Sequence, residues 1–256
     1  LTPSVGVIPA KGYKVLWFDH NEADPRQIDF KLDCDGGTFY IADENGNLVT
    51  LQSYPAAISR TSYARTTDGA NNWGLTALPT PGKSNDGSVF ATARLDAPII
   101  NKDSQLFTSS FIARVTIPDG ATLKYTTDGT TPSATNGQVS TTGRFTVNAT
   151  TTYRFRLFQD GMLPSEVITR SYIYKDKEFK LPVISVVTDP VNLYDDSLGV
   201  YVKGVNGRPG NGQSTPCNWN MEWDRPVNFE YITPDGKMAF NQEVDFAMCG
   251  GWSRAW

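Results

Sequence analysis

Short segments in which hydrophobic and polar residues alternate run through most of this chain. In the clearest segment, Tyr153, Phe155 and Leu157 occupy every second position. Arg154 and Arg156 fill the positions between them. Successive side chains of a β-strand point to opposite faces, so this pattern predicts an antiparallel strand with one buried and one solvated face.

The same reading predicts strands along the rest of the chain. They are expected at residues 13–18, 28–32, 38–42, 48–51, 112–117, 123–127, 167–174, 181–187, 227–232 and 238–246. Asp-Gly and Asn-Gly pairs in the connections are typical of tight turns, and residues 43–47 and 234–236 are expected to close two hairpins. The apolar run at 181–187 is interpreted as a buried strand.

One short helix is expected, over Asn192 to Asp195. Asp189 precedes Pro190, and an aspartate that caps free N–H groups before a proline is a helix-start signal. The 22 glycines, 16 prolines and 12% aromatic residues also favour many strands joined by turns. The predicted fold class is therefore all-β, with sandwiches in tandem followed by a β-rich segment containing at most one short helix.

Composition shifts divide the 256 residues into three expected modules, at 1–88, 92–175 and 180–256. A Pro/Gly-rich exit at 78–82 closes the first module, and the charged residues 175–178 separate the second from the third. About seven strands fall in the second module, which is the number typical of an immunoglobulin-like sandwich.

Charge and apolar length exclude two classes of partner. The net charge is −4, from 27 acidic and 23 basic residues spread without long blocks, so no basic field attracts nucleic acid. The longest apolar run, 181–187, is far shorter than the roughly 20 residues that cross a bilayer, so no membrane span is expected. Cys34, Cys217 and Cys249 are expected as three buried free thiols, with a Cys217–Cys249 bridge as the alternative.

No residue type forms a convincing catalytic or metal constellation. His20 is the sole histidine and lies in a polar segment, which favours a solvated loop residue. No serine has the G-x-S-x-G surroundings of a nucleophile elbow. Residues 43–47 depart from the spacing of a calcium loop, and a capping role for Asp189 accounts for one of three nearby carboxylates, Asp195 and Asp196 being the others. We predict no catalytic and no metal-binding residue.

The first module carries several motifs of a known family. Residues 11–17 read KGYKVLW, 30–32 read FKL, 43–46 read DENG, 62–65 read SYAR and 79–85 read PTPGKSN. Together these resemble the second half of a bacterial lamin-tail domain. The family's opening strands are not in this chain, and we expect the module to be a partial β-sandwich.

The second module contains YTTDGTTP at 125–132, TTYRFR at 151–156 and a final serine-to-tyrosine stretch at 165–172. This order resembles the immunoglobulin-like C-terminal domain of chitobiases and β-hexosaminidases. The resemblance covers the whole module and implies an immunoglobulin-like sandwich without chemistry of its own.

The third module contains LPVIS at 181–185, TDP at 188–190, GVYV at 199–202, RPVNFEY at 225–231 and GGWSR at 250–254. It resembles the start of a CotH kinase family domain, with Cys249-Gly250 where the family usually has histidine-glycine. The resemblance implies ATP and magnesium as cofactors of a longer parent protein. The family's catalytic aspartates lie downstream of GGWSR, so no catalytic residue is assigned to this chain, which needs no cofactor of its own.

The leading functional hypothesis is a non-catalytic accessory or spacer region of a bacterial surface or secreted CotH-kinase-like protein, located outside the cytoplasm. A cell-surface protein or a polysaccharide is the expected kind of partner. One alternative is a carbohydrate-binding or adhesive module that uses Trp219 and Trp223, because exposed aromatic rings stack on sugar faces. The other is part of an atypical kinase in which Gly250, Gly251, Ser253 and Arg254 contact a nucleotide.

Overall fold

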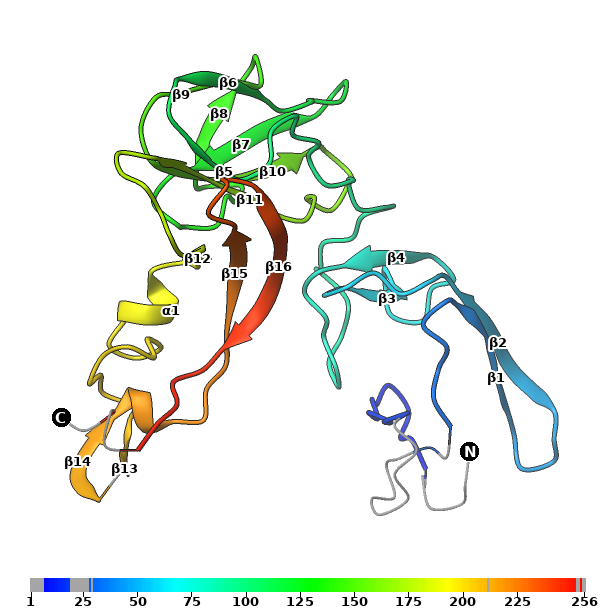
Figure 1. The fold of residues 1–256 in the computed structure, drawn as a ribbon. Coiled ribbons are helices and arrows are strands. Elements are labelled where there is room, and N and C mark those ends of the chain that lie inside the picture. Colours follow the sequence, from blue (N-terminus) through cyan, green and yellow to red (C-terminus); the bar gives the residue numbers. More distant parts are fainter. Residues whose placement is uncertain (1–6, 19–27, 29, 211, 252–253, 255–256) are drawn as a thin grey trace. The chain divides into compact units, whose positions relative to one another are not determined.

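The computed structural model describes residues 7–18, 28, 30–210, 212–251 and 254. The chain divides into two compact units, drawn in Figure 1. Unit 1 is Leu1–Arg94 with Gly161–Leu163, and unit 2 is Leu95–Asp160 with Pro164–Trp256. Strands dominate both units, which confirms the all-β prediction. Within the described part of the chain, no helix is long and apolar enough to cross a bilayer.

Unit 1 contains two hairpins. They consist of β1 (Gly37–Ala42) with β2 (Leu48–Tyr54), and β3 (Ser62–Arg65) with β4 (Trp73–Thr76). Asp43 closes the first turn, because its Oδ1 accepts hydrogen bonds from the N–H groups of Asn45 at 2.9 Å and Asn47 at 2.8 Å. The Asn47 side chain also donates to the Asp43 carboxyl. Together these hydrogen bonds lower the pKa of the carboxyl, and the bond from the Asn47 side chain has the largest effect. The hairpin predicted across residues 43–47 is confirmed.

Two strands expected in unit 1 are wrong. Residues 13–18 form no ladder; the described pairing there is limited to the Ile28 N–H, which donates to the Trp17 carbonyl at 2.7 Å. Residues 30–32 are likewise outside any strand. Trp17, Phe30 and Leu32 stay 40–55% exposed, so the alternating pattern lacks the buried face that holds a strand in register.

The core of unit 1 is small. Leu75, Ala91 and Leu163 form a buried cluster against which Ile58 packs. Leu75 and Ala91 also exchange two backbone hydrogen bonds, at 2.9 and 2.8 Å. Among the described residues of this unit, the expected partial sandwich is represented by the two separate hairpins and this cluster.

The first part of unit 2 is a seven-stranded sandwich. A five-stranded sheet has the order β5-β11-β10-β7-β8, and β6 pairs with β9 as a second sheet. The strands are β5 (Gln105–Phe107), β6 (Phe111–Arg114), β7 (Thr122–Thr126), β8 (Gln138–Ser140), β9 (Arg144–Val147), β10 (Thr151–Phe158) and β11 (Ile168–Tyr174). Rings join the two sheets, with Phe145 of β9 lying 4.9 Å from both Tyr125 and Phe155 between centroids.

The alternation first seen in the sequence sets the two faces of β10. Tyr153, Phe155 and Leu157 are buried at 9%, 0% and 2% exposure, whereas Arg154 and Arg156 point to the opposite face of the sheet. The strands expected around residues 112–117, 123–127 and 167–174 are also present, within a few residues, as β6, β7 and β11.

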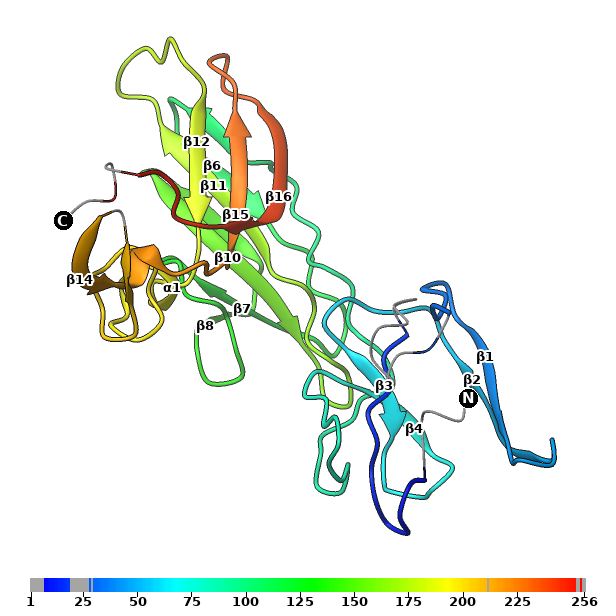
Figure 2. The same cartoon turned by 90° about the horizontal axis from the view of Figure 1, so that it is seen from below.

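The second part of unit 2 is a three-stranded antiparallel sheet with its connections. Its order is β12-β15-β16, formed by β12 (Val183–Val187), β15 (Arg225–Ile232) and β16 (Met238–Phe246), and these strands run beside β11 in Figure 2. The predicted hairpin across residues 234–236 is therefore confirmed. Between β12 and β15 lie α1 (Val191–Tyr194), β13 (Arg208–Gly210), β14 (Gln213–Cys217) and the 3₁₀ turn η2 (Asn218–Asn220).

Three local predictions need correction. Strand β12 is not buried on both faces, since Ile184 and Val186 are 55% and 46% exposed; it is an edge strand that packs on one face. The helix begins one residue early, with Pro190 at the cap position, although Asp189 Oδ1 still accepts the Val191 N–H at 3.3 Å. All three cysteines are free, but Cys217 alone is buried, because Cys34 and Cys249 lie outside the strands.

Tyr172 on β11 makes alkaline pH a test of the sandwich core. Its side chain is fully buried, and its hydroxyl donates to the Lys102 carbonyl at 2.9 Å. Burial raises the pKa of this hydroxyl well above its ordinary value. An unfolded tyrosine releases its proton near pH 10, roughly, while the folded one keeps it, so the free energy of unfolding falls as the pH rises above about 10.

Chemical unfolding at pH 9, 10 and 11 measures this effect. The unsubstituted chain is expected to lose stability more steeply over this range than a Tyr172→Phe variant, which lacks the titrating hydroxyl. Equal slopes for the two proteins would contradict the assignment.

Candidate functional site

The two candidate sugar-binding tryptophans are partly covered in the structure. Trp219 lies in η2 and Trp223 in the loop before β15, and both are half-buried. The guanidinium carbon of Arg225 lies 4.8 Å from the centroid of the Trp223 ring. Sugar contact at Trp219 and Trp223 stays a prediction.

Three of the candidate nucleotide-binding residues, Gly250, Gly251 and Arg254, are described in the segment that follows β16. Gly250 has a φ of +111°, and the Arg254 N–H donates to the Gly251 carbonyl at 3.0 Å. The Arg254 guanidinium donates to the carbonyl of Gly250 and, at 3.1 Å, to that of Trp219. The structure therefore brings Arg254 and Trp219 together, which the sequence did not predict. Ser253 and His20 lie outside the described residues.

A row of polar side chains crosses the three-stranded sheet. The strand register aligns Ser185 of β12 with Glu230 of β15, and Glu230 with Asn241 of β16. All three lie on the face turned toward the five-stranded sheet of the sandwich, as their contacts show. A sheet face that packs against another is usually apolar, so a row containing a carboxyl group stands out.

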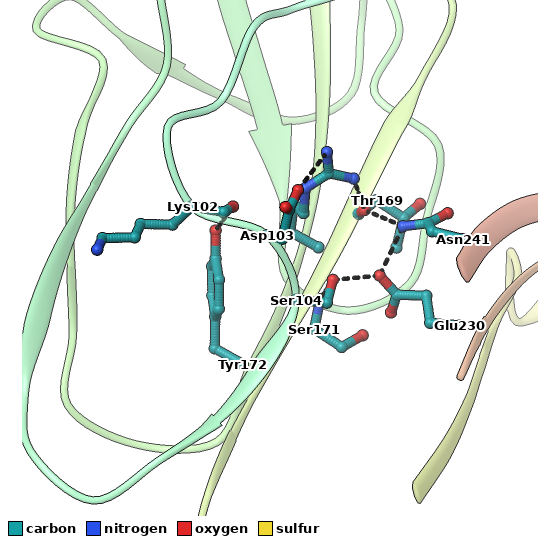
Figure 3. A network of polar contacts seen from close by, with 9 residues as sticks. Lys102, Asp103, Ser104, Thr169, Ser171, Tyr172, Glu230 and Asn241 are labelled. Atoms are coloured by element: carbon teal, nitrogen blue, oxygen red, sulfur yellow. Dashed lines mark hydrogen bonds and ion pairs between the residues drawn. The ribbon is translucent and has the colours of Figure 1, made fainter. Parts of the chain in front are cut away.

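The sandwich presents matching polar groups to this row. Ser104, Thr169 and Ser171 are buried at 0%, 2% and 1% exposure. Figure 3 shows Ser104 and Glu230 pointing toward one another from the two sheets. We call the six residues of this contact the polar joint; they are Ser104, Thr169, Ser171, Ser185, Glu230 and Asn241.

Hydrogen bonds connect the two halves of the polar joint. The Ser104 hydroxyl donates to Glu230 Oε1, and it accepts the Ser171 N–H at 3.0 Å. Asn241 Nδ2 donates both to Glu230 Oε1, at 2.8 Å, and to the Thr169 carbonyl, at 3.0 Å. The Ser171 and Ser185 hydroxyls lie 2.8 Å apart. Strands β12 and β16 thus bond to β11, and β15 bonds to Ser104, the residue before β5.

Glu230 is the centre of the polar joint. Its side chain is completely buried, and its Oε1 accepts two hydrogen bonds, while Oε2 has no partner among the described residues. A buried polar atom without a partner costs about 1–3 kcal/mol, and an apolar residue at this position would avoid that cost. In return the polar joint fixes the register, because a one-residue slip of β15 would bring Phe229 or Tyr231 against Ser104.

Backbone hydrogen bonds extend the interface between the sandwich and the three-stranded sheet beyond the polar joint. The Leu106 N–H of β5 donates to the carbonyl of Gly236 at 3.1 Å, and Gln105 forms an isolated bridge with Lys237. Gly236 adopts a φ of +92° in the turn between β15 and β16. The hairpin tip predicted at residues 234–236 therefore reaches the edge of the sandwich sheet.

The opposite end of the contact uses the Asp128-Gly129 turn. The Thr131 N–H donates to Asp189 Oδ2 at 3.3 Å, and Arg154 Nη1 donates to the Gly129 carbonyl at 2.8 Å. Burial lowers the pKa of the Arg154 guanidinium from its ordinary value. Gly129 has a φ of +84°, and a Cβ there would lie 2.8 Å from the Thr188 carbonyl oxygen. Only glycine fits this close approach without strain.

Carboxylates and a thiol lie close together in one exposed turn of unit 1. Within the described residues, one group of three ligand atoms lies within 4.8 Å of one another, on Asp33, Cys34 and Asp35, and all three residues are exposed. Asp33 Oδ1 already accepts the Asp35 N–H at 2.9 Å, which is the pattern of a turn. Asp195, one of the three carboxylates near the helix, accepts hydrogen bonds from the N–H groups of Ser197 and Leu198.

The sequence reading missed the polar joint. Ser104 and Glu230 are 126 residues apart, and nothing in the local pattern pairs them. One signal was available, because a glutamate at the centre of the β-rich run from Val227 to Ile232 is unusual unless it is solvated or paired.

Comparison with known proteins bears on the sandwich. No curated protein matches the chain. Residues 104–169, which include β5 to β10 and begin at Ser104 of the polar joint, match the family model of the chitobiase/beta-hexosaminidase C-terminal domain.

Proposed function

We propose that this chain is a non-catalytic accessory region of an extracytoplasmic protein, in which the immunoglobulin-like sandwich is a fixed platform for the segment that follows it. The observation that carries this proposal is the polar joint, in which the fully buried Glu230 is bonded to Ser104 of the sandwich. A buried polar contact with defined partners favours a single arrangement of two sheets over a sliding one.

The location of the platform and its parent protein rest on resemblance. The motifs at 181–185, 225–231 and 250–254 are similar to the start of a CotH kinase domain. The family match at residues 104–169 supports a carbohydrate-associated, immunoglobulin-like module. We propose that the chain belongs to a secreted or cell-surface protein whose partner is a surface protein or polysaccharide.

Amide hydrogen exchange on the full chain tests the fixed platform. The Leu106 N–H group reports on the contact, since it donates to the Gly236 carbonyl of the β15–β16 hairpin. We expect it to exchange as slowly as the Phe155 amide in the centre of β10. Fast exchange of the Leu106 amide, with Phe155 still protected, would show that the segment undocks and would remove the proposal.

The kinase alternative has a separate test. Phosphoryl transfer needs a phosphate cradle and magnesium ligands, and here the Arg254 guanidinium already donates to the Gly250 and Trp219 carbonyls. Titration of the chain with ATP and magnesium, followed by calorimetry, is expected to give no binding heat. Saturable, magnesium-dependent binding that Arg254→Ala abolishes would instead support a nucleotide site and overturn the non-catalytic assignment.

A further inference from the structure

Unit 1 contains a cavity that none of the predicted sites uses. Its volume is about 750 Å³, within the range typical of small-molecule sites. It lies at the β3–β4 hairpin, where residues 11–13 also contribute to its wall. Besides two basic side chains, the lining contains three aromatic and three acidic or amide side chains; these six are Tyr13, Tyr63, Trp73, Asp68, Asn85 and Asp86.

The aromatic part of the lining is open to solvent. Tyr13 and Tyr63 are 49% and 37% exposed, although large apolar rings are usually covered in a folded protein. The Tyr63 and Trp73 rings lie 5.4 Å apart between centroids and are inclined by 21°, so they form a nearly parallel pair on one face of the hairpin. Among the described residues, the buried indole N–H of Trp73 has no hydrogen-bond acceptor.

The polar part of the lining is held in place by hydrogen bonds. The Tyr13 hydroxyl donates to Asp68 Oδ2, and the Asn85 N–H donates to Asp68 Oδ1 at 3.0 Å. The Asp68 N–H donates to Asp86 Oδ1 at 3.1 Å. The hydrogen bonds that the Asp68 carboxylate accepts, that from Tyr13 first, lower its pKa, so this carboxylate is ionised at neutral pH. Carboxylate oxygens are acceptors suited to the hydroxyl groups of a sugar.

The charges that line the cavity balance. Lys11 and Arg65 carry two positive charges, and Asp68 and Asp86 carry two negative ones. Such a cavity does not favour a phosphate or another strongly anionic ligand. Exposed aromatic rings suit the C–H face of a pyranose, and ordered acceptors suit its hydroxyls, so the combination fits a neutral ligand with one apolar and one hydroxylated side.

We propose that this cavity binds a neutral carbohydrate, with Tyr63 stacking on a sugar ring and Asp68 and Asp86 accepting its hydroxyl groups. The site is distinct from the polar joint and from Trp219 and Trp223. It therefore adds a binding activity in unit 1 to the platform role proposed for unit 2.

Calorimetry of the full chain with neutral hexasaccharides from chitin, cellulose, starch and mannan tests the proposal. At least one is expected to bind saturably, and Tyr63→Ala is expected to weaken that binding at least tenfold. Tyr40→Ala is the matched control, because Tyr40 is a 71% exposed tyrosine of the same unit outside the cavity. It should leave the affinity unchanged.

A second variant guards against loss of folding at Tyr63. Asp86→Ala removes one acceptor at an exposed position and is also expected to weaken binding, with the circular dichroism spectrum of the chain unchanged. Absence of saturable binding by all four hexasaccharides at millimolar concentration would overturn the proposal. Tighter binding of a polyamine such as spermidine would overturn it too, since that result would identify a cation site. Failure of either kind leaves the exchange test of the polar joint unaffected.

Discussion

A Glu230→Ala variant is expected to lower the free energy of unfolding of unit 2 by about 3 kcal/mol. The substitution removes the acceptor of the Ser104 hydroxyl and of Asn241 Nδ2. The Ser104 hydroxyl is fully buried and loses its acceptor, and a buried polar group left unsatisfied costs about 1–3 kcal/mol. A cavity the size of the lost side chain adds to the cost. Urea unfolding of the full chain, followed by near-ultraviolet circular dichroism, measures the change.

Two controls separate the hydrogen bonds from other effects of the substitution. Glu230→Gln preserves the side-chain length and one carbonyl oxygen, so it is expected to stay within about 1 kcal/mol of the parent chain. Glu178→Ala removes an exposed glutamate and is expected to change the stability by less than about 0.5 kcal/mol. A Glu230→Ala variant as stable as these two would show that the polar joint does not form.

Asn218 gives the second large effect, in the loop region between α1 and β15. Its fully buried amide joins three backbone segments: Nδ2 donates to the carbonyls of Asp196 and Gly199, each at 3.0 Å, and Oδ1 accepts the Asn206 N–H at 3.2 Å. Replacement by alanine removes all three bonds at once. We expect Asn218→Ala to lower the free energy of unfolding by about 3 kcal/mol.

The glycine-rich stretch nearby follows from the same contact. Gly204 has a φ of +63°, and a Cβ there would lie 2.0 Å from Asn218 Nδ2, so the loop passes too close for any side chain. Asn206→Ala is the matched control, because Asn206 is exposed and its side chain bonds only to the Ser197 carbonyl in the described structure. It should cost less than about 1 kcal/mol, and equal losses for the two variants in urea unfolding would contradict the central role of Asn218.

Local pattern was sufficient to predict elements whose partners are close in sequence. The hairpin β1–β2 closes through Asp43, and β15–β16 closes at Gly236, and both turns are visible as short motifs. The parity of Tyr153 and Arg154 likewise predicted which face of β10 is buried. In each case the motif and the residues that it contacts or orders lie within one segment of fewer than about twenty residues.

Local sequence patterns did not predict contacts between distant segments. Residues 13–18 have the alternation of a strand, yet Tyr13 bonds to Asp68, 55 residues away, and no strand in the described part of the chain pairs with them. The polar joint is a longer-range case, because the alternation around Glu230 predicts which side of β15 it occupies but not which surface that side meets. The family match likewise ends at residue 169, before β15 begins.

A double-mutant cycle between Ser104 and Glu230 tests most directly the claim that the sandwich is a fixed platform for the C-terminal sheet. Ser104 directly precedes β5 of the sandwich and Glu230 lies in β15 of the C-terminal sheet, so their coupling exists only if the two sheets are docked in the folded chain. We expect Ser104→Ala and Glu230→Ala together to cost about 1–2 kcal/mol less than the sum of the single losses, because the double variant leaves no hydroxyl without its acceptor. Additivity within about 0.5 kcal/mol would contradict the account.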